Sequence, residues 1–220
     1  MAMVLVTGAS SGIGLELCRH YVGRGDQVIA ACRRVTDALA ALNVRVVEGV
    51  DVATSAGPER LKAALGGERV DVLINNAGVL ANDTLGDIDG DSVMQQFLVN
   101  ALGPLRITEA LLDNLGAGSK VAMITSRMGS MADNGSGAYY GYRMSKAALN
   151  AAGVSLARDL APRGVAVALL HPGFVQTRMV GFAGDISPEE SASRLAARID
   201  ELTMESSGSF WHSGGDILPW

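Results

Sequence analysis

The sequence has 220 residues, 48% of them apolar, and 18 basic against 23 acidic side chains give a formal net charge of -5 at pH 7. This size and apolar content predict one domain, residues 1–220, with one substantial core. The charges are mixed along the chain, and the lack of a basic stripe argues against nucleic-acid binding. Cys18 and Cys32 lack metal-ligand or C-x-x-C spacing, so we expect buried thiols in a reducing compartment and no metal. No cationic leader or long apolar run precedes the first predicted strand, which favours a cytoplasmic protein.

The first predicted elements are a strand, a glycine-rich turn and a helix. An apolar strand over residues 3–6 runs into Thr7-Gly8-Ala9-Ser10-Ser11-Gly12-Ile13-Gly14, and a helical pattern follows. Glycines let the backbone approach a diphosphate, and a helix N-terminus offers free N–H groups to the anion. We therefore predict a dinucleotide site. Its residues are Gly8, Ser10, Ser11, Gly12, Ile13 and Gly14.

The spacing of these glycines differs from the common G-x-G-x-x-G pattern, because three residues separate Gly8 from Gly12. The pattern Thr-Gly-x-x-x-Gly-x-Gly resembles the short-chain dehydrogenase/reductase (SDR) family, and the resemblance extends over almost the whole chain. It implies a doubly wound, Rossmann-like α/β fold with a mostly parallel sheet of about seven strands and a bound nicotinamide cofactor.

A second strand, residues 27–32, is followed by Arg33 and Arg34. Doubly wound folds commonly place a carboxylate here to bind the adenosine ribose. A guanidinium can instead pair with a 2'-phosphate, so Arg33 favours NADP(H), with NAD(H) as the less favoured cofactor. The hydroxyls of Ser10 and Ser11 are candidate donors to the same phosphate. The alternative is that both arginines are only solvated charges at a strand end.

Two further strands lead to residues that the resemblance places beside the cofactor. The strand over residues 45–50 ends at Asp51 and Val52, where the family has an acid against the adenine ring. The alternative is that Asp51 caps the next turn. After a short helix over residues 58–65, the strand over residues 70–74 leads to Asn75-Asn76-Ala77-Gly78. In the family the segment containing Asn76, Ala77 and Gly78 steadies the sheet and passes beside the cofactor, although an asparagine pair is otherwise common in turns.

A long helical pattern runs over residues 91–115, with Asn100 and Pro104 inside it. Proline lacks a backbone N–H, so Pro104 predicts a local distortion of the helix. The resemblance places Asn100 where the family has a helix-bending asparagine whose backbone holds a water in the proton relay from the lysine. The alternative is a polar residue that faces solvent.

A fifth apolar strand, residues 120–125, delivers Ser126 to the carboxyl edge of the sheet, where doubly wound folds bind ligands. Ser126 resembles the family's catalytic serine, which hydrogen-bonds the substrate oxygen. Thr125 and Ser130 are competing hydroxyls. We prefer Ser126 because Gly129 follows it at the family's usual interval.

The stretch Tyr142-Arg143-Met144-Ser145-Lys146 places a phenol and an ammonium on one face of a helix. An ammonium beside a phenol favours the phenolate, so we expect Lys146 to lower the pKa of Tyr142 toward working pH. Such a pair can do proton chemistry on an alcohol or carbonyl, although any surface helix can carry this spacing. The resemblance makes Tyr142 the general acid and lets Lys146 also hold the nicotinamide ribose, so both are predicted to bind cofactor.

The segment before this helix, residues 131–140, is a few residues longer than in most members of the family. Of Tyr139, Tyr140 and Tyr142, only Tyr142 has a lysine four residues later. This insert and the closing residues 215–220 resemble the branch of sniffer-like carbonyl reductases and C-factor-like bacterial proteins.

Small residues dominate the helix after Lys146, over residues 147–157, and another helix could approach it closely. The family packs this helix against a symmetry mate, which implies a homodimer or homotetramer. The alternative is close packing on its own sheet.

A sixth strand, residues 165–170, ends at His171-Pro172-Gly173. The resemblance assigns Pro172, Gly173, Val175 and Thr177 to the cofactor, near the nicotinamide. We interpret His171 as a structural residue rather than a catalytic base. Residues 174–185 should lie over the substrate, and a final helix beginning after Ser187 and a last strand over residues 209–212 complete the chain.

Together these patterns predict an NADP(H)-dependent oxidoreductase that interconverts a carbonyl and an alcohol, acting on a small molecule. Apolar candidates for an open pocket favour bulky aldehydes, ketones or quinones. A sugar-nucleotide epimerase or dehydratase would share the tyrosine and lysine, but the glycine spacing and the lack of a sizeable C-terminal substrate domain disfavour it. A signalling or cofactor-sensing protein is the alternative from another class. The predicted catalytic residues are Asn100, Ser126, Tyr142 and Lys146, and the pocket candidates are Met128, Phe174, Met179, Val180 and Phe182.

Overall fold

The computed structural model describes residues 1–220, and its centre is one sheet of seven strands in the order β3-β2-β1-β4-β5-β6-β7. Every neighbouring pair of strands is parallel. The predicted doubly wound fold is therefore confirmed, with the sheet wholly rather than mostly parallel. The strands are β1 (Met3–Thr7), β2 (Gln27–Cys32), β3 (Arg45–Glu48), β4 (Val72–Asn75), β5 (Lys120–Ile124), β6 (Ala166–His171) and β7 (Phe210–His212).

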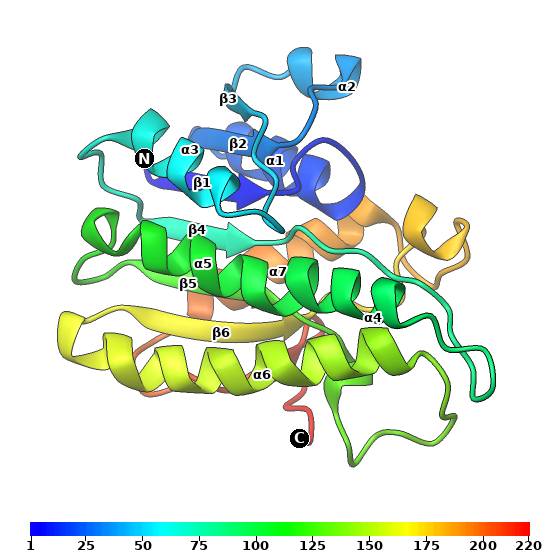
Figure 1. Ribbon diagram of the computed structural model, residues 1–220. Coiled ribbons are helices and arrows are strands. Elements are labelled where there is room, and N and C mark those ends of the chain that lie inside the picture. The colour runs from blue at the N-terminus through cyan, green and yellow to red at the C-terminus, as the bar shows by residue number, and fades with distance from the viewer.

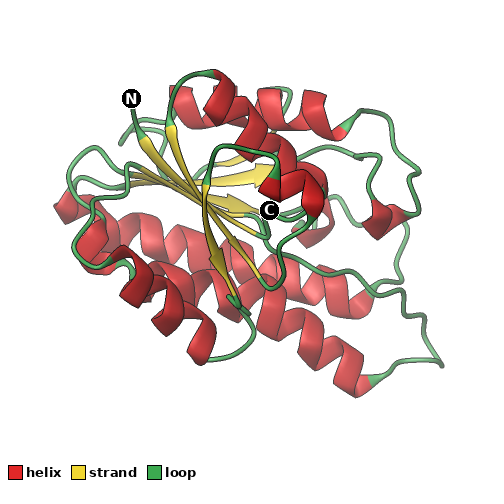
Figure 2. Ribbon diagram, turned by 90° about the horizontal axis from the view of Figure 1, so that it is seen from above, coloured by secondary structure: helices red, strands yellow, loops and turns green.

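Helices cover both faces of the sheet (Figure 1, Figure 2). Leu17 of α1 and Leu195 of α7 lie in the core on one face. Leu61 of α3, Ile107 of α5 and Leu149 of α6 lie in the core on the other. The helices are α1 (Gly12–Gly23), α2 (Asp37–Ala40), α3 (Ala56–Leu65), α4 (Gly90–Phe97), α5 (Gly103–Ala110), α6 (Tyr140–Leu160) and α7 (Pro188–Glu201).

The central strand β1 shows why the strands read as continuous apolar runs. Val4 and Val6 pack in the core shared with α1 and α7, whereas Leu5 packs in the core on the opposite face. All three side chains are fully buried. A parallel sheet covered on both faces has no solvated side, so alternation of apolar and polar residues is lost.

The long helix predicted over residues 91–115 is wrong as a single element. It divides into α4, a π-helical turn at Leu98–Leu102, and α5, and a short 3-10 turn follows at Leu112–Asn114. Gly103 N donates to Leu98 O, which is the wide spacing of a π-helix. The next residue, Pro104, has no N–H to donate, so the predicted distortion near Pro104 is confirmed.

Two helix starts illustrate what local sequence does and does not reveal. Ser187 caps α7 as predicted, because its side chain accepts a hydrogen bond from Glu190 N at 3.1 Å. The four-residue helix α2 was not predicted, although Thr36 caps it by accepting from Leu39 N at 3.3 Å. A helix this short carries no periodic apolar pattern.

The strand order reverses at β1, which has β2 on one side and β4 on the other. In doubly wound folds a crevice opens at this reversal, outside the carboxyl ends of the strands. The glycine turn after β1 and the segment after β4 both lie there. None of the helices combines the length and the apolar character that crossing a membrane would require.

Candidate functional site

The glycine turn between β1 and α1 packs too closely against its surroundings to accept side chains. A methyl group at Gly8 would lie 2.8 Å from Ala77 Cα, and one at Gly14 would lie 2.3 Å from Gly8 O. Gly12 has a φ of +55°, a left-handed conformation that favours glycine. Ser11 precedes α1 without capping it by its side chain. The first N–H groups of α1 thus remain available to an anion, and the turn fits the diphosphate of a dinucleotide.

Thr7 and Asn76 lock this turn to the end of β4. Thr7 Oγ1 accepts hydrogen bonds from Asn76 N (3.0 Å) and Ala77 N (3.2 Å). Asn76 Nδ2 donates in return to Thr7 O (3.0 Å) and Gly8 O (3.3 Å). The structure therefore brings Asn76, Ala77 and Gly8 together, and it adds the threonine hydroxyl, which the sequence did not single out.

Arg33 and Arg34 are exposed directly after β2. Neither arginine belongs to any of the ion pairs in the structure. Thr36 Oγ1 donates to Ser10 O at 2.8 Å, which holds the segment after β2 against the glycine turn. The segment that carries the two arginines is thus held against Ser10, and neither guanidinium pairs with a carboxylate of the chain.

Asp51 takes the local role that was its alternative. Its Oδ1 accepts a hydrogen bond from Ala53 N at 3.0 Å, so the carboxylate caps the turn after β3. Val52 is buried, and α5 begins so close to it that a methyl group at Gly103 would lie 3.0 Å from Val52 Cβ. Contact of Asp51 or Val52 with an adenine ring stays a prediction.

The three candidate hydroxyls at the end of β5 have three different partners. Thr125 Oγ1 donates to Asn150 Oδ1 at 2.6 Å and so ties β5 to α6. Ser130 Oγ accepts from Asp133 N at 3.1 Å. Ser126 Oγ accepts from Met128 N at 3.1 Å, and its hydroxyl acts on the phenol of Tyr142, where it lowers the pKa against the effect of burial. Of the three hydroxyls, only that of Ser126 acts on the phenol of Tyr142, and its catalytic role stays a prediction.

Gly129 explains how the Ser126 turn comes so close to α6. A methyl group at this position would lie 2.7 Å from the backbone carbon of Lys146 and 2.9 Å from Ala147 N. Only a residue without a side chain lets the turn and the helix backbone touch. The interval between Ser126 and Gly129 thus has a packing reason.

Tyr142 and Lys146 are both buried on one face of α6, and Lys146 Nζ lies 5.7 Å from the centre of the Tyr142 ring. The expectation that Lys146 lowers the pKa of Tyr142 is wrong for this structure. Burial raises the pKa of Tyr142 to about 12, opposed by the smaller effect of the Ser126 hydroxyl. Burial also lowers the pKa of Lys146 to about 7. Lys146 Nζ donates to Ile124 O at 2.8 Å rather than to the phenol. Desolvation therefore sets the direction of both pKa shifts.

Asn100 lies inside the π-helical turn and is fully buried, so the solvent-facing alternative is wrong. Its amide pairs with Val79, accepting from Val79 N and donating to Val79 O, each at 2.8 Å. The same amide donates to Ser145 Oγ at 3.0 Å, and Ser145 Oγ donates to Tyr142 O at 2.8 Å. A methyl group at Gly78 would lie 3.3 Å from Asn100 Oδ1 and 3.8 Å from Lys146 Nζ. Asn100 thus reaches α6 through Ser145, which the sequence did not single out.

The segment after β6 returns to the glycine turn. Pro172 O accepts hydrogen bonds from Ser191 Oγ (2.9 Å) and Ser213 Oγ (3.1 Å). Gly173 has a φ of +92°, and a methyl group there would lie 3.0 Å from Ile186 Cδ1. Further along, a methyl group at Gly12 would lie 3.4 Å from the Thr177 side chain. This segment, in which Val175 is buried, therefore closes one side of the crevice.

His171 is buried at the end of β6, and its Nδ1 has no hydrogen-bond partner. Burial, followed by the effect of His212, lowers the pKa of His171 to about 3. The two imidazole rings meet edge to face, with centres 5.1 Å apart. A neutral, packed ring agrees with the interpretation of His171 as a structural residue.

The apolar candidates for a substrate pocket differ in exposure. Phe174, Met179 and Phe182 are exposed, whereas Met128 and Val180 are half-buried. Four of the five lie in the short segment after β6. Phe182 also has a left-handed backbone, with a φ of +63°.

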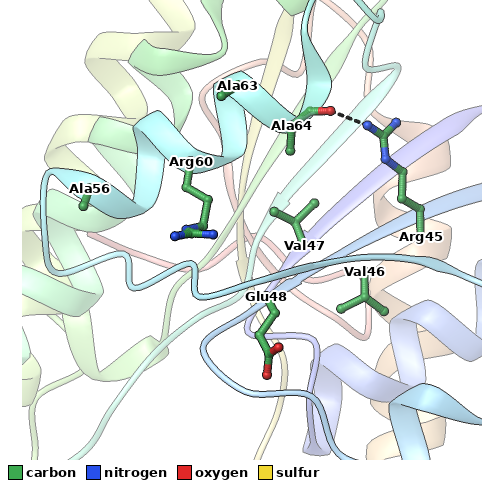
Figure 3. Close-up of a pocket in the computed structure, with 8 residues that line it drawn as sticks. All are labelled: Arg45, Val46, Val47, Glu48, Ala56, Arg60, Ala63 and Ala64. Atoms are coloured by element: carbon green, nitrogen blue, oxygen red, sulfur yellow. Dashed lines mark hydrogen bonds between the residues drawn. The ribbon is translucent and has the colours of Figure 1, made fainter.

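One surface hollow lies elsewhere, between β3 and α3 (Figure 3). Arg45 crosses it with a hydrogen bond to Ala64 O. None of the predicted catalytic or cofactor residues lines this hollow, so it does not compete with the crevice as a catalytic site. Its lining residues are Arg45, Val46, Val47, Glu48, Ala56, Arg60, Ala63 and Ala64.

Comparison with known proteins gives matches over most or all of the chain. A protein-family model described as short chain dehydrogenase matches residues 2–188. The 1-hydroxy-2-glutathionyl-2-methyl-3-butene dehydrogenase of Rhodococcus sp. (strain AD45) is 44% identical over 226 residues, which cover 100% of both chains. C-signal of Myxococcus xanthus is 49% identical over 154 residues, which cover 69% of this chain and 93% of that protein.

Solved structures match the fold throughout. The NADPH-bound carbonyl reductase from chicken fatty liver superposes with a TM-score of 0.92 at 27% identity, covering 100% of this chain and 99% of that one. The carbonyl reductase Sniffer of D. melanogaster gives a TM-score of 0.91 at 26% identity, covering 100% of both chains.

Proposed function

The chain belongs to the short-chain dehydrogenase family and is an oxidoreductase, and from that premise we propose that it interconverts a carbonyl and an alcohol with NADP(H). One observation carries the proposal. Buried Tyr142 lies beside Lys146 on α6, and the hydroxyl of Ser126, which follows β5 at the carboxyl edge of the sheet, acts on its phenol. These are the groups needed to hold a carbonyl oxygen and give it a proton.

Reduction of a carbonyl needs a proton donor at the developing alkoxide. Because burial raises the pKa of Tyr142 to about 12, its phenol is protonated at neutral pH and can act as the general acid. Ser126 polarises the same oxygen through its hydroxyl. When bound, the reduced nicotinamide supplies the hydride, whereas the protein supplies orientation and charge.

Lys146 replenishes the proton of Tyr142 in this proposal. With its pKa lowered to about 7, the side chain exchanges protons near neutrality, which an ordinary lysine does not do. Asn100 is proposed to hold a water of this proton relay with its backbone, and its side-chain bonds to Val79 and Ser145 fix its position. The π-helical turn around Asn100 supports this role, since such turns concentrate at functional sites.

Preference for NADP(H) rests on Arg33. Arg33 is exposed and belongs to no ion pair, and the segment that carries it is held by Thr36 against the glycine turn. A 2'-phosphate would pair with such a group, whereas a 2'-hydroxyl gains little from it. The NADPH in the chicken carbonyl reductase supports the same cofactor for this fold.

A titration of NADPH against NADH, followed by nicotinamide fluorescence, tests the cofactor. We expect NADPH to bind at least about tenfold more tightly, and Arg33→Ala to weaken NADPH binding about tenfold while leaving NADH unchanged, in line with loss of a charge-assisted hydrogen bond. Arg19→Ala is the control, because this exposed arginine already pairs with Glu16. Equal affinity for both cofactors would contradict the role of Arg33.

The substrates we propose are bulky aldehydes, ketones or quinones, because Phe174, Met179 and Phe182 leave an exposed apolar surface on the short segment beside the crevice. A panel that includes 4-nitrobenzaldehyde and 9,10-phenanthrenequinone, with NADPH oxidation as the readout, tests this. The Rhodococcus relative extends the panel to alcohols that carry a glutathionyl group, which are tested in the oxidising direction with NADP+ and with NADPH formation as the readout. Turnover of none of these compounds would count against the proposed reaction.

We also propose a homodimer or homotetramer in a reducing, cytoplasmic environment. Both cysteines are free and buried, which suits such an environment. On α6, Ala147, Ala148 and Ala152 are only partly buried, which leaves small residues for a helix of a second copy. Gly153 instead serves the chain's own sheet, because a methyl group there would lie 2.7 Å from Leu169 Cδ2.

A signalling role is the second candidate, and the 49% identity to C-signal favours it. It predicts specific NADP(H) binding without turnover of any carbonyl in the panel. Turnover by the wild type that disappears in Tyr142→Phe would establish catalysis and leave signalling as an additional role.

A further inference from the structure

The helix that carries Tyr142 begins without a capping side chain of its own. Ala138 and Tyr139 both have left-handed backbones, with φ of +52° and +54°. This conformation is costly for residues other than glycine and persists only where the surroundings hold it. Tyr139 precedes the first turn of α6, and its side chain accepts no hydrogen bond from the helix. The first N–H groups of α6 therefore need an acceptor from elsewhere in the fold.

Asp83, in the loop after β4, supplies that acceptor. Its backbone O accepts from Tyr139 N at 2.8 Å, and its carboxylate accepts from Tyr140 N and from Gly141 N, the latter at 3.1 Å. The carboxylate bonds reach 57 and 58 residues along the chain. Asp83 is only 6% exposed and belongs to none of the ion pairs. One residue thus satisfies three successive N–H groups just before Tyr142.

Two buried amides fix the loop that presents Asp83. Gln96 Oε1 accepts from Ala81 N at 3.1 Å, and Asn100 holds Val79 at both its N–H and its carbonyl. Gly141 lets these parts meet, since a methyl group there would lie 2.5 Å from Gln96 Nε2 and 3.2 Å from Asp83 Oδ2. The loop after β4 is therefore held by Gln96 of α4 and by Asn100 of the π-helical turn, and its Asp83 in turn holds the start of α6.

We propose that Asp83 is a positioning residue for the reaction: its carboxylate fixes the first turn of α6 and thereby sets the Tyr142 hydroxyl relative to Ser126. The inference rests on the proposed function for its catalytic consequence. Two carboxylate oxygens match two N–H donors, and both act as acceptors. An asparagine offers one oxygen, and its NH2 group would face the other donor.

Asp83→Asn tests this, with Asp89→Asn as the matched control. Asp89 also caps a helix with its carboxylate, since its Oδ1 accepts from Asp91 N (2.9 Å) and Ser92 N (3.4 Å) of α4, but α4 carries no predicted catalytic residue. With NADPH and 4-nitrobenzaldehyde, we expect Asp83→Asn to lower kcat at least tenfold while the KM for NADPH changes less than twofold. Asp89→Asn should leave both within twofold. A folded Asp83→Asn variant with wild-type kcat would overturn the proposal, as would a loss of NADPH binding in proportion to kcat.

Hydrogen exchange of the same variants gives a reading that does not depend on turnover. Amides of residues 139–142 should exchange at least tenfold faster in Asp83→Asn, whereas those of residues 150–160 should not change. Unchanged exchange at residues 139–142 would refute the role of Asp83, whether or not the wild type reduces a carbonyl. A wild type that reduces no carbonyl would count only against the proposed reaction. Should Asp83→Asn not fold, Asp83→Ser keeps one acceptor oxygen and carries the same expectations.

Discussion

The proposed cofactor crevice at the glycine turn and the proposed catalytic face of α6 are built by opposite means. The glycine turn depends on the absence of side chains at Gly8 and Gly14. A methyl group would lie 2.8 Å from backbone at Gly8 and 2.3 Å from backbone at Gly14. Around Tyr142 the site consists of buried polar groups such as Asn100, Ser126 and Lys146, each with a named partner. Added atoms should therefore impair stability and NADPH binding at the glycine turn, whereas removal of polar atoms should impair catalysis around Tyr142.

The largest effect should come from removing one oxygen on the catalytic side. Tyr142→Phe deletes the proposed general acid and keeps the ring, so we expect kcat to fall by roughly 10²–10⁴ while NADPH affinity stays within about twofold. Steady-state rates and nicotinamide fluorescence measure the two quantities. Tyr140→Phe makes the same change two residues away and should keep wild-type kcat. Full activity in Tyr142→Phe would mean that another group gives the proton.

The next effect should come from adding one carbon on the cofactor side. Gly14→Ala places a methyl group 2.3 Å from Gly8 O, so we expect about 1–3 kcal/mol lower unfolding free energy and clearly weaker NADPH binding. Gly23→Ala is the matched control in the same helix, since nothing lies within 4 Å of a methyl group there. It should stabilise by up to about 1 kcal/mol, as alanine does in helices. Urea unfolding and fluorescence titration measure both, and equal behaviour of the two variants would undo the contrast.

The smallest effect should be on the pH dependence of stability, and it should come from the buried side chain of His171. Because the pKa of His171 falls from 6.5 to about 3 on folding, the unfolded chain takes up a proton between these values that the folded chain does not. Stability should therefore fall as pH drops below about 6.5, by at most about 1.4 kcal/mol per pH unit. Urea unfolding at pH 7 and pH 5 should show this loss to be smaller in His171→Gln. The same pH dependence in both proteins would assign it to other groups.

Prediction from sequence succeeded where the physical cause is local. The glycine turn follows from missing side chains within eight residues, and Ser187 caps α7 within three residues. The parallel sheet follows from apolar runs that alternate with helical patterns. These features depend on spacing along the chain, which the sequence displays directly.

Prediction failed where the cause is burial or distant contact. The pKa of Tyr142 was expected to fall, because spacing reveals Lys146 but not the loss of water around both groups. Asp83 escaped notice because its partners are backbone N–H groups more than 50 residues away, which no residue type marks. Ser145 escaped notice for the same reason, because its partner Asn100 lies 45 residues away in sequence.

The place of β1 in the middle of the sheet has a consequence for how the protein is made. Met3 N donates to Asp71 Oδ2, 68 residues later, and β4 pairs with β1 directly. During synthesis β1 must therefore wait, with one edge unpaired, until β4 has emerged. Exposed strand edges of this kind invite association between chains, and such long-range pairing forms slowly. The same strand order that opens the crevice thus leaves the first strand paired on one edge only until β4, which ends at Asn75, has been made.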